Sequence, residues 1–318
     1  MKTRITRRRF IQSSAATGVS LTLGGGVLGS LAESAFAEAA EASGVVAVTG
    51  PDGYRNTVAA VEAVGGISRF VPKGASVVVN ANTAFKHRGS IVSPGVLLAT
   101  LELCAEAGAK EVVLLKGSKD GYWERCDRAE GRASLIDGAR VSERKYEVVE
   151  VERGIALKEA HVDRHFLSAD VYLDVAIAKH HKGCEFTGAL KNTMGACPHD
   201  PTCRFFHVGS DPDPDSKDWY PDLDHMAQCI ADLNTLRQPD LTILDAGEIL
   251  VTNGPFGPGK LETPNAVVAA TDMVAADAYA VRYLGLEPAS VPMIAKAEEH
   301  GVGSSDLTAV GVREIVPG

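Results

Sequence analysis

The chain has 318 residues, 45% of them hydrophobic, and a formal net charge of −9 at pH 7. This acidity argues against nucleic-acid binding, because phosphate contacts require clustered lysine and arginine side chains. It also disfavours binding to anionic membrane surfaces. The length and apolar content are typical of a soluble globular protein with a core large enough for two lobes.

Residues 1–37 have the features of a twin-arginine (Tat) signal peptide. Arg7 and Arg8 stand in the sequence Thr-Arg-Arg-Arg-Phe-Ile-Gln, which fits the twin-arginine address. A weakly apolar, glycine-rich stretch follows, and Ala35-Phe36-Ala37 is a small-x-small site of the kind that signal peptidase cuts. The alternative, a membrane anchor helix, has too few strongly apolar residues for a stable span.

We therefore expect the Tat translocase to be a partner during export. The mature chain is expected in the periplasm, or otherwise outside the cytoplasmic membrane, with no stable membrane span. Removing residues 1–37, which hold five basic residues and one acid, changes the formal charge from −9 to −13. Because the Tat machinery moves folded proteins, its cargo often acquires a cofactor or metal ion before export.

Beyond the signal peptide, apolar periodicity predicts alternating strands and helices. Residues 75–79 form an almost continuous apolar, β-branched run, which is typical of a strand covered on both faces. Ser93 and Pro94 suit the N-cap and first position of a helix that Gly108 ends, and Thr271 suits the cap of a later helix. In chain order we expect strand 45–49, helix 54–64, strand 75–79, helix 95–107, strand 111–115, helix 123–131, strands 147–151 and 171–177, helices 186–194 and 223–236, strands 241–244 and 265–270, helices 272–284 and 291–300, and strand 310–315.

This alternation predicts an α/β fold, doubly wound, with one or more mostly parallel sheets. We expect two Rossmann-like lobes, an N-terminal lobe over residues 38–160 and a C-terminal lobe over residues 161–318 that carries the functional site. No G-x-G-x-x-G follows the first strand, so no dinucleotide site is predicted.

Residues 178–207 are the part of the sequence richest in chemically active side chains. They contain four of the nine histidines and three of the six cysteines, and they begin where the buried strand 171–177 ends. In open parallel sheets that carboxyl edge is where ligands bind. The side chains expected to line a cleft between the lobes are Lys179, His180, His181, Lys191, Asn192, Arg204 and His207 on one side, with Asp245 and Asn253 on the other.

In these segments the sequence resembles the domain of unknown function 362 family over nearly the whole mature chain. The motifs that carry the resemblance are residues 178–181, Thr187 with 190–195, His207, 230–233, 240–246, 253–255, 270–278 and 300–303. The family has no settled reaction. Many of its members carry an appended ferredoxin-like domain and are called iron–sulfur proteins for that reason.

The chain departs from the family pattern in two ways. It has no C-x-x-C-x-x-C-x-x-x-C run, so the usual ground for an iron–sulfur cluster is absent. The family's Lys-Pro-Asn after the early strand is replaced by Asn80-Ala81-Asn82, without a lysine that would meet an anionic ligand.

The cysteines after position 180 leave three interpretations open. Cys184, Cys197 and Cys203, with His199 or His207, are the ligand types that zinc or a cluster requires. A Cys197–Cys203 disulfide suits an oxidising compartment, and unpaired thiols are the third interpretation. A metal ion or an iron–sulfur cluster is therefore a possible cofactor, with Cys184, Cys197, His199 and Cys203 as its candidate ligands.

Other candidate residues also have two interpretations. His180 and His181 are either ligands or bases in the cleft, or one buried and one exposed structural histidine. Lys191 and Asn192 either bind an anionic or carbonyl group, or Asn192 caps the backbone while Lys191 is solvated. Asp277 is expected to be a buried, paired carboxylate, and Asp272 a first-turn residue favoured by the helix dipole.

The leading functional hypothesis is an exported enzyme or redox protein that depends on a metal or cofactor and acts on a small-molecule ligand. Its catalytic candidates are His180, His181, Lys191, Asn192 and His207, and its ligand-binding candidates are Lys179, Thr187, Arg204, Asp245, Asn253 and Asp277. The alternative is a non-catalytic periplasmic binding protein for a small anion or metal complex. A third interpretation, a racemase-like enzyme with a nickel-bearing nucleotide, rests on analogy of fold alone.

The export hypothesis is tested by replacing Arg7 and Arg8 with lysine, which keeps the charge and removes the twin-arginine address. We expect uncleaved precursor to accumulate in the cytoplasm, measured by fractionation and mass spectrometry. Normal maturation of this double variant, with Glu38 as its first residue, would contradict the hypothesis.

Overall fold

A computed structural model describes residues 44–209, 218–220 and 222–316. The predicted signal peptide, residues 1–37, lies outside the described residues. In the ranges that are described, no helix is long and apolar enough to cross a membrane.

The centre of the structure is an eight-stranded sheet. Its strands, in spatial order, are β14 (Val312–Ile315), β1 (Val45–Thr49), β13 (Ala266–Ala270), β10 (Leu241–Ala246), β7 (Val171–Ile177), β2 (Ser76–Ala81), β3 (Glu111–Leu114) and β4 (Arg140–Val141). Strand β13 runs antiparallel to both of its neighbours, and the other pairings in this sheet are parallel.

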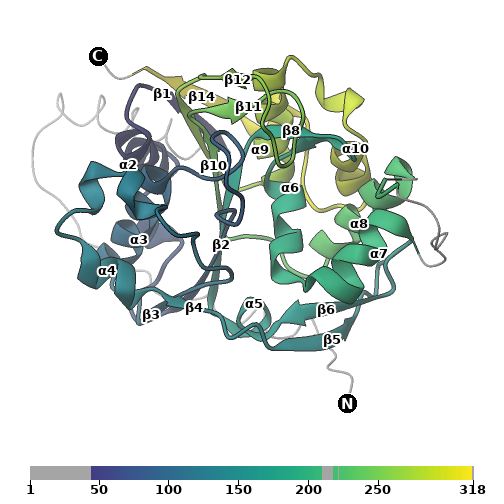
Figure 1. Cartoon of the computed structure of the whole chain (residues 1–318), viewed down its shortest axis with the longest axis horizontal. Coiled ribbons are helices and arrows are strands. Elements are labelled where there is room, and N and C mark those ends of the chain that lie inside the picture. The colour runs from purple at the N-terminus through teal and green to yellow at the C-terminus, as the bar shows by residue number, and fades with distance from the viewer. Residues whose placement is uncertain (1–43, 210–217, 221, 317–318) are drawn as a thin grey trace, which may run out of the picture.

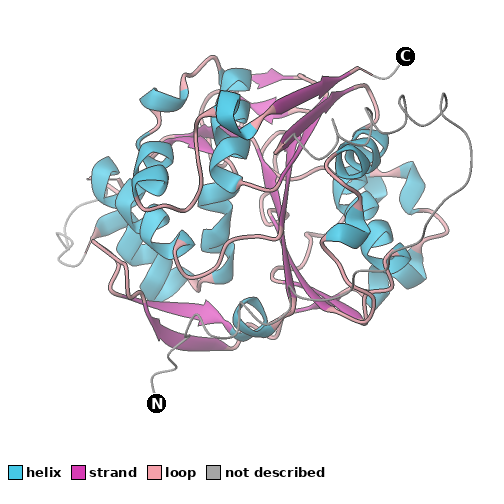
Figure 2. Ribbon diagram, turned by 180° about the vertical axis from the view of Figure 1, so that it is seen from behind, coloured by secondary structure: helices cyan, strands magenta, loops and turns pink. Residues whose placement is uncertain are grey.

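Helices cover both faces of this sheet. One face carries α2 (Gly53–Ala63), α3 (Pro94–Glu106) and α4 (Ala133–Gly138), and the other carries α6 (Ala189–Asn192), α8 (Leu223–Asn234), α9 (Met273–Ala280) and α10 (Pro292–Glu299) (Figure 1). The view from behind shows the same strand layer between two helical layers (Figure 2).

Each face of the sheet has its own hydrophobic core, because successive side chains of a strand point to opposite faces. In β1, Val46 and Val48 belong to the core under α2 and α3, whereas Val45 and Ala47 belong to the core under α8, α9 and α10. The central strands are buried on both faces and therefore consist mostly of apolar residues, as in the β7 sequence VYLDVAI.

Shorter elements fill the connections. They are β5 (Tyr146–Glu150), β6 (Glu159–Asp163), α5 (Arg164–Ser168), β8 (Lys179–His181), β9 (Glu185–Thr187), α7 (Arg204–Val208), β11 (Ile249–Leu250), β12 (Leu261–Glu262) and α11 (Leu307–Val310). The pairs β5–β6, β8–β9 and β11–β12 each form a separate two-stranded sheet.

The predicted α/β fold with a mostly parallel sheet is confirmed. Strands from both predicted lobes lie in the one central sheet: β1 to β4 precede residue 160, and β7, β10, β13 and β14 follow it. A division near residue 160 therefore does not separate two sheets, and the helical layers on the two faces are the main subdivision of the structure.

Several local predictions differ from the structure. The expected strand 147–151 exists as β5, but it pairs antiparallel with β6 outside the central sheet. The expected helix 123–131 is two short 3₁₀ turns, Trp123–Arg125 and Asp127–Ala129. The cap of α9 is Asp272 and not Thr271, because the Asp272 carboxylate accepts hydrogen bonds from the amides of Val274 and Ala275.

The expected helix 186–194 is the difference that matters most for the site. Residues 179–187 form the β8–β9 hairpin, and the helical part is reduced to α6 and a 3₁₀ turn at Thr193–Ala196. In the hairpin Lys179 pairs with Thr187, and His181 pairs with Glu185.

Candidate functional site

The candidate site lies at the carboxyl edge of the parallel strands. Strand β7 leads through Ala178 into the β8–β9 hairpin, which is followed by α6. Strands β2 and β3 end at the same edge, because both run parallel to their neighbours. This is the edge at which open α/β sheets bind their ligands.

Helix α6 begins on a buried carboxyl group. Asp277 of α9 is fully buried, and its two oxygens accept hydrogen bonds from the amides of Ala189 at 2.6 Å and Leu190 at 3.0 Å. Gly188 precedes the helix, and a Cβ atom there would collide with the Asp277 carboxyl group. Glycine is therefore required for this close approach.

The other end of α6 is fixed by amide groups. The Asn192 Nδ2 donates to Asp174 Oδ1 and to the Asn80 carbonyl, both at 2.8 Å, and the Asn80 Nδ2 donates to the Asn192 carbonyl at 2.6 Å. Asn80 and Asp174 are neighbours in register on β2 and β7. The main chain on both sides of Lys191 is thus tied to the sheet and to α9.

Three lysines meet near α6, and together we call them the basic cluster: Lys116 after β3, Lys179 in β8 and Lys191 in α6. Burial lowers the pKa of Lys116 and of Lys179, and the charge of Lys191 lowers both further. Across the part of the chain that the structure describes, none of the three forms an ion pair within 4.0 Å.

Lys179 is the most deeply placed of the three, with 1% of its surface exposed. Its Nζ donates to the Ser90 carbonyl at 2.7 Å and lies 4.2 Å from the centroid of the Phe85 ring. Thr187 stands opposite Lys179 in the hairpin, and its buried hydroxyl has no hydrogen-bond partner in the structure. Both side chains therefore have unused hydrogen-bonding capacity at the same point.

Two histidines flank the basic cluster. Burial and then the charge of Lys191 lower the pKa of His181 well below its usual value and that of His207 to about 4. The Tyr220 ring lies between them, with centroid distances of 5.5 Å to His181 and 5.6 Å to His207. Both imidazoles are therefore neutral at pH 7.

The hydrogen bonds assign the proton on each ring. The His207 Nδ1 faces the Cys203 carbonyl, so Nδ1 carries the proton and Nε2 is left as an acceptor. The His181 Nδ1 accepts from the Gly183 amide at 2.9 Å, so the proton of the neutral ring is on Nε2. The two rings thus present one acceptor and one donor beside the lysines.

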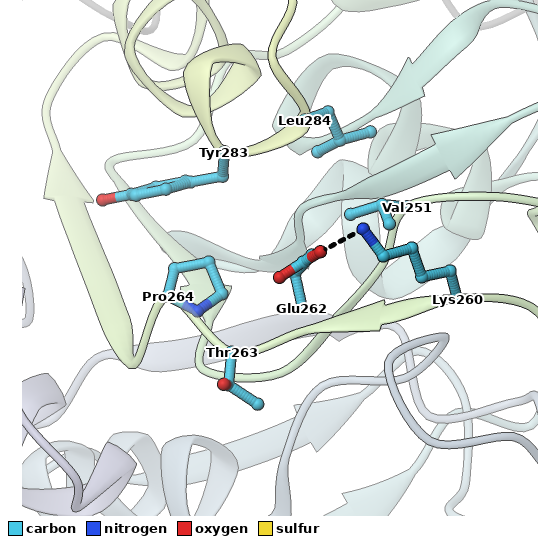
Figure 3. A pocket seen from close by; sticks show the side chains of 7 residues that line it. All are labelled: Val251, Lys260, Glu262, Thr263, Pro264, Tyr283 and Leu284. Atoms are coloured by element: carbon cyan, nitrogen blue, oxygen red, sulfur yellow. Dashed lines mark ion pairs between the residues drawn. The ribbon is translucent and has the colours of Figure 1, made fainter.

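One cavity is lined by the connection between β10 and β13 and by two residues that follow α9. It has a volume of about 440 Å³ and is lined by Val251, Lys260, Glu262, Thr263, Pro264, Tyr283 and Leu284. Figure 3 shows the side chains of Lys260 and Glu262 pointing toward each other, and their charged atoms are 2.6 Å apart. Its cation is already neutralised, so this cavity lacks the unpaired charge of the basic cluster.

The sequence profile described as domain of unknown function (DUF362) matches residues 76–282, which is more than half of the chain. The chain belongs to the DUF362 family. A thylakoid-associated protein of Synechocystis sp. is 26% identical over 261 residues, covering 78% of this chain and 75% of that protein.

Two solved structures are similar in fold to this DUF362 protein. The lactate racemase apoprotein of Thermoanaerobacterium thermosaccharolyticum has a TM-score of 0.44 at 11% identity, over 73% of this chain and 55% of that one. A protein of Thermotoga maritima has a TM-score of 0.37 at 14% identity, over 62% of this chain and 51% of that one. The DUF362 chain thus spans little more than half of each of these structures.

In this DUF362 protein the structure brings some of the predicted residues together. Lys179, His181, Lys191 and His207 interact electrostatically, and Thr187 adjoins Lys179. Lys116 is not among the predicted site residues, although it follows the predicted strand 111–115 at the same edge. Its position directly after a buried parallel strand is the sequence feature that indicates a place at the ligand-binding edge.

Other predicted residues hold the backbone. The His180 Nδ1 accepts a hydrogen bond from the Gly254 amide at 3.1 Å. Asn253 is exposed, and its side chain donates to the Pro258 carbonyl.

Asp245 accepts hydrogen bonds from the amides of Ser93 and Gly247 on the face that carries α3. Arg204 is exposed, with its guanidinium carbon 5.8 Å from the Trp219 ring centroid. Asn192 and Asp277 position α6, as described above.

The four predicted metal ligands are not assembled. Within the described ranges no group of three or more His, Cys, Asp or Glu side chains is arranged to hold a metal ion, and all six cysteines are free, so the Cys197–Cys203 disulfide is not formed either. Burial raises the pKa of Cys197 and Cys203, and that of Cys184 to about 12, which keeps these thiols protonated. His199 is exposed, and the Cys184 thiol donates to the Phe186 carbonyl at 3.2 Å.

The free thiols give a direct chemical prediction. Protein unfolded without reductant is expected to alkylate at all six cysteines, whereas folded protein leaves the four buried ones unmodified: Cys104, Cys184, Cys197 and Cys229. Mass spectrometry of tryptic peptides measures both. Recovery of a linked Cys197–Cys203 peptide from unreduced protein would show that the two thiols are paired.

The buried carboxyl groups predict an unusual dependence of stability on pH. Burial raises the pKa of Asp174 to about 8 and that of Asp277 to about 7, from 3.8. Above about pH 4 the unfolded chain loses these protons, whereas the folded chain keeps that of Asp277 to about pH 7 and that of Asp174 to about pH 8. Their contribution to stability therefore falls as the pH rises through this window. Each pKa unit corresponds to about 1.4 kcal/mol.

We therefore expect Asp174→Asn to gain stability relative to the wild type between pH 5 and pH 9, by on the order of 1 kcal/mol or more. Asn at this position also offers a donor near the unpartnered Thr242 hydroxyl, since Thr242 and Asp174 are register neighbours. Urea unfolding at both pH values measures the effect. The exposed Asp137→Asn is the matched control and should keep the pH dependence of the wild type. If the free energy of unfolding changes equally with pH in the two variants, the prediction is contradicted.

Proposed function

We propose that this protein is an exported α/β enzyme that binds a small anionic ligand at the basic cluster and transfers a proton there. The observation that carries the proposal is the presence of Lys116, Lys179 and Lys191 at one sheet edge without an acidic partner in the described residues. Cations that are partly or fully buried are costly unless an opposite charge accompanies them. An anionic ligand would supply that charge.

The neighbouring side chains suit proton transfer. His207 offers an unprotonated Nε2, and His181 a protonated one. The unpartnered hydroxyl of Thr187 adds a further donor for a ligand oxygen beside Lys179. The arrangement therefore combines charge neutralisation with groups that accept and donate protons.

Dependence on a metal ion or an iron–sulfur cluster stays a prediction. Neutral imidazoles such as those of His181 and His207 are metal ligands, but two imidazoles alone are fewer ligands than a structural site requires. Export also stays part of the proposal, and it rests on the sequence of residues 1–37.

The second candidate function is that of a non-catalytic binding protein for a small anion. It needs the basic cluster but gives His181 and His207 no role in chemistry. Anions that bind to the protein should be incubated with it in D₂O and examined by NMR. Deuterium incorporation or any chemical turnover supports the enzyme, whereas binding without either supports the binding protein.

The anion site can be tested before a substrate is known. The charge of Lys191 lowers the pKa of His207 after burial, so Lys191→Ala should raise the pKa of His207 from about 4 toward its usual value, measured by NMR titration of the imidazole. Adding inorganic phosphate to the wild type should raise the same pKa, because a bound anion stabilises the imidazolium.

Lys182→Ala is the matched control, because Lys182 is an exposed lysine in the same hairpin region. It should leave the pKa of His207 and the phosphate effect unchanged. Lys182→Ala should keep its free energy of unfolding within about 0.5 kcal/mol of the wild type, as surface substitutions do. Urea unfolding of Lys191→Ala shows that this variant is folded before its His207 is titrated. If phosphate does not change the pKa of His207 at any concentration, the basic cluster is not an anion site.

A further inference from the structure

A second cavity, of about 370 Å³, opens at the carboxyl edge near the basic cluster. Two segments line it, one after β2 and one after β3, and its side chains are Phe85, Lys86, Ile91, Lys119, Asp120, Tyr122 and Arg125. Its size lies in the range of pockets that hold small molecules. We call it the edge cavity.

The apolar wall of the edge cavity is fixed by the interior of the protein. Tyr122 is buried, its hydroxyl donates to the Val92 carbonyl at 3.0 Å, and its ring packs edge-on against Trp123 at 5.0 Å. The next residue, Ser93, is held by its amide hydrogen bond to Asp245 at 2.6 Å. This wall is preformed, so a ligand would not have to order it on binding.

The charged side chains of the edge cavity are three cations and one acid, in a chain whose formal net charge is −9. Lys86, Lys119 and Arg125 form no ion pair within 4.0 Å among the described residues. Basic residues elsewhere on the same face differ, since Arg88, Arg128 and Arg132 are each paired with a carboxylate. The cavity therefore offers two positive charges in excess beside an aromatic and aliphatic surface.

The edge cavity is connected to the basic cluster through one loop. Residues 82–92 carry Phe85, Lys86 and Ile91, and Lys179 binds this loop twice, through the Ser90 carbonyl and through the Phe85 ring. Phe85 also packs edge-on against the exposed Phe256, at 5.1 Å between centroids. A group that enters the cavity would thus contact the ring that covers Lys179.

We infer that the edge cavity is a binding site for a small organic anion that combines a flat apolar group with a phosphate or carboxylate. The flat group lies against Phe85, Ile91 and Tyr122, and the anionic group is bound by Lys119 and Arg125, with Lys86 beside them. Arginine suits this role because its guanidinium binds two oxygens of one phosphate or carboxylate at once. The site needs no reaction at the basic cluster, and so it stands independently of the proposed function.

The test is calorimetric titration of the full chain with phenyl phosphate, which has both required groups, and with the neutral benzyl alcohol. We expect phenyl phosphate to bind and benzyl alcohol to bind at least tenfold more weakly. Lys119→Ala and Arg125→Ala should each weaken phenyl phosphate at least fivefold, and Phe85→Leu should weaken it while keeping an apolar side chain. Thermal unfolding of every variant shows whether it is folded.

A control variant makes the outcome decisive. Lys110→Ala removes an exposed lysine at the amino end of β3, away from the edge cavity, and should bind phenyl phosphate like the wild type. Unchanged affinity in Lys119→Ala and Arg125→Ala, an equal loss of affinity in Lys110→Ala, or no binding of phenyl phosphate at all would each overturn the inference.

The same experiments separate this inference from the proposed function. Failure of the basic cluster appears as a His207 pKa that does not respond to phosphate or to Lys191→Ala. Failure of the edge cavity appears as phenyl phosphate binding that does not respond to Lys119→Ala or Arg125→Ala. Either can fail while the other holds.

Discussion

Helix α6 has four residues, too few to be stable through its own hydrogen bonds, and two buried carboxyl groups hold it in place. Asp277 satisfies its first amides, and Asp174 anchors the Asn192 side chain at its end. Two of the three lysines in the basic cluster depend on this helix for their position. Lys191 lies on it, and the β8–β9 hairpin with Lys179 and His181 leads into it.

Burying these carboxyl groups is costly, and the raised pKa values of both measure that cost. A purely structural helix could be anchored by apolar packing at lower cost, as the large apolar helices of the same layer are. The polar anchors do something that apolar contacts do not, since hydrogen bonds fix direction as well as position. Lys191 is thereby kept close to Lys116, Lys179 and His207, and its charge lowers the pKa of all three.

The sequence allowed the fold to be predicted well where periodicity is strong. Residues 171–177 match β7 residue for residue, and the helix from Pro94 has the predicted start, because continuous apolar runs and caps are local properties. The β8–β9 hairpin could not be predicted, since its strands have three residues each and are defined by the pairing of Lys179 with Thr187. The order of the strands could not be predicted for a related reason, because it depends on contacts far apart in the chain.

The site was predicted in part, and the pattern of errors has a physical cause. Lys179, His181, Lys191 and His207 were found because they follow one strand closely in sequence, whereas Lys116 follows a different strand and comes near them only in the folded sheet. The cysteines and His199 attracted a metal interpretation through their chemistry alone. Sequence spacing reveals neither the burial that raises the pKa of Cys184 and Cys197 nor the arrangement of the side chains in the fold.

The contrast between the acidic chain and its basic edge bears on what can reach the site. At physiological ionic strength the Debye screening length is roughly 8 Å. The electrostatic potential at the sheet edge is therefore set by the nearest lysines and not by the net charge of the chain. A small anion that fits among them experiences a positive potential. A long polyanion would extend beyond both the basic cluster and the edge cavity, along a chain whose formal net charge of −9 disfavours it. The charge distribution therefore selects for size as well as for sign, and it favours a small anionic ligand over a nucleic acid at the same lysines.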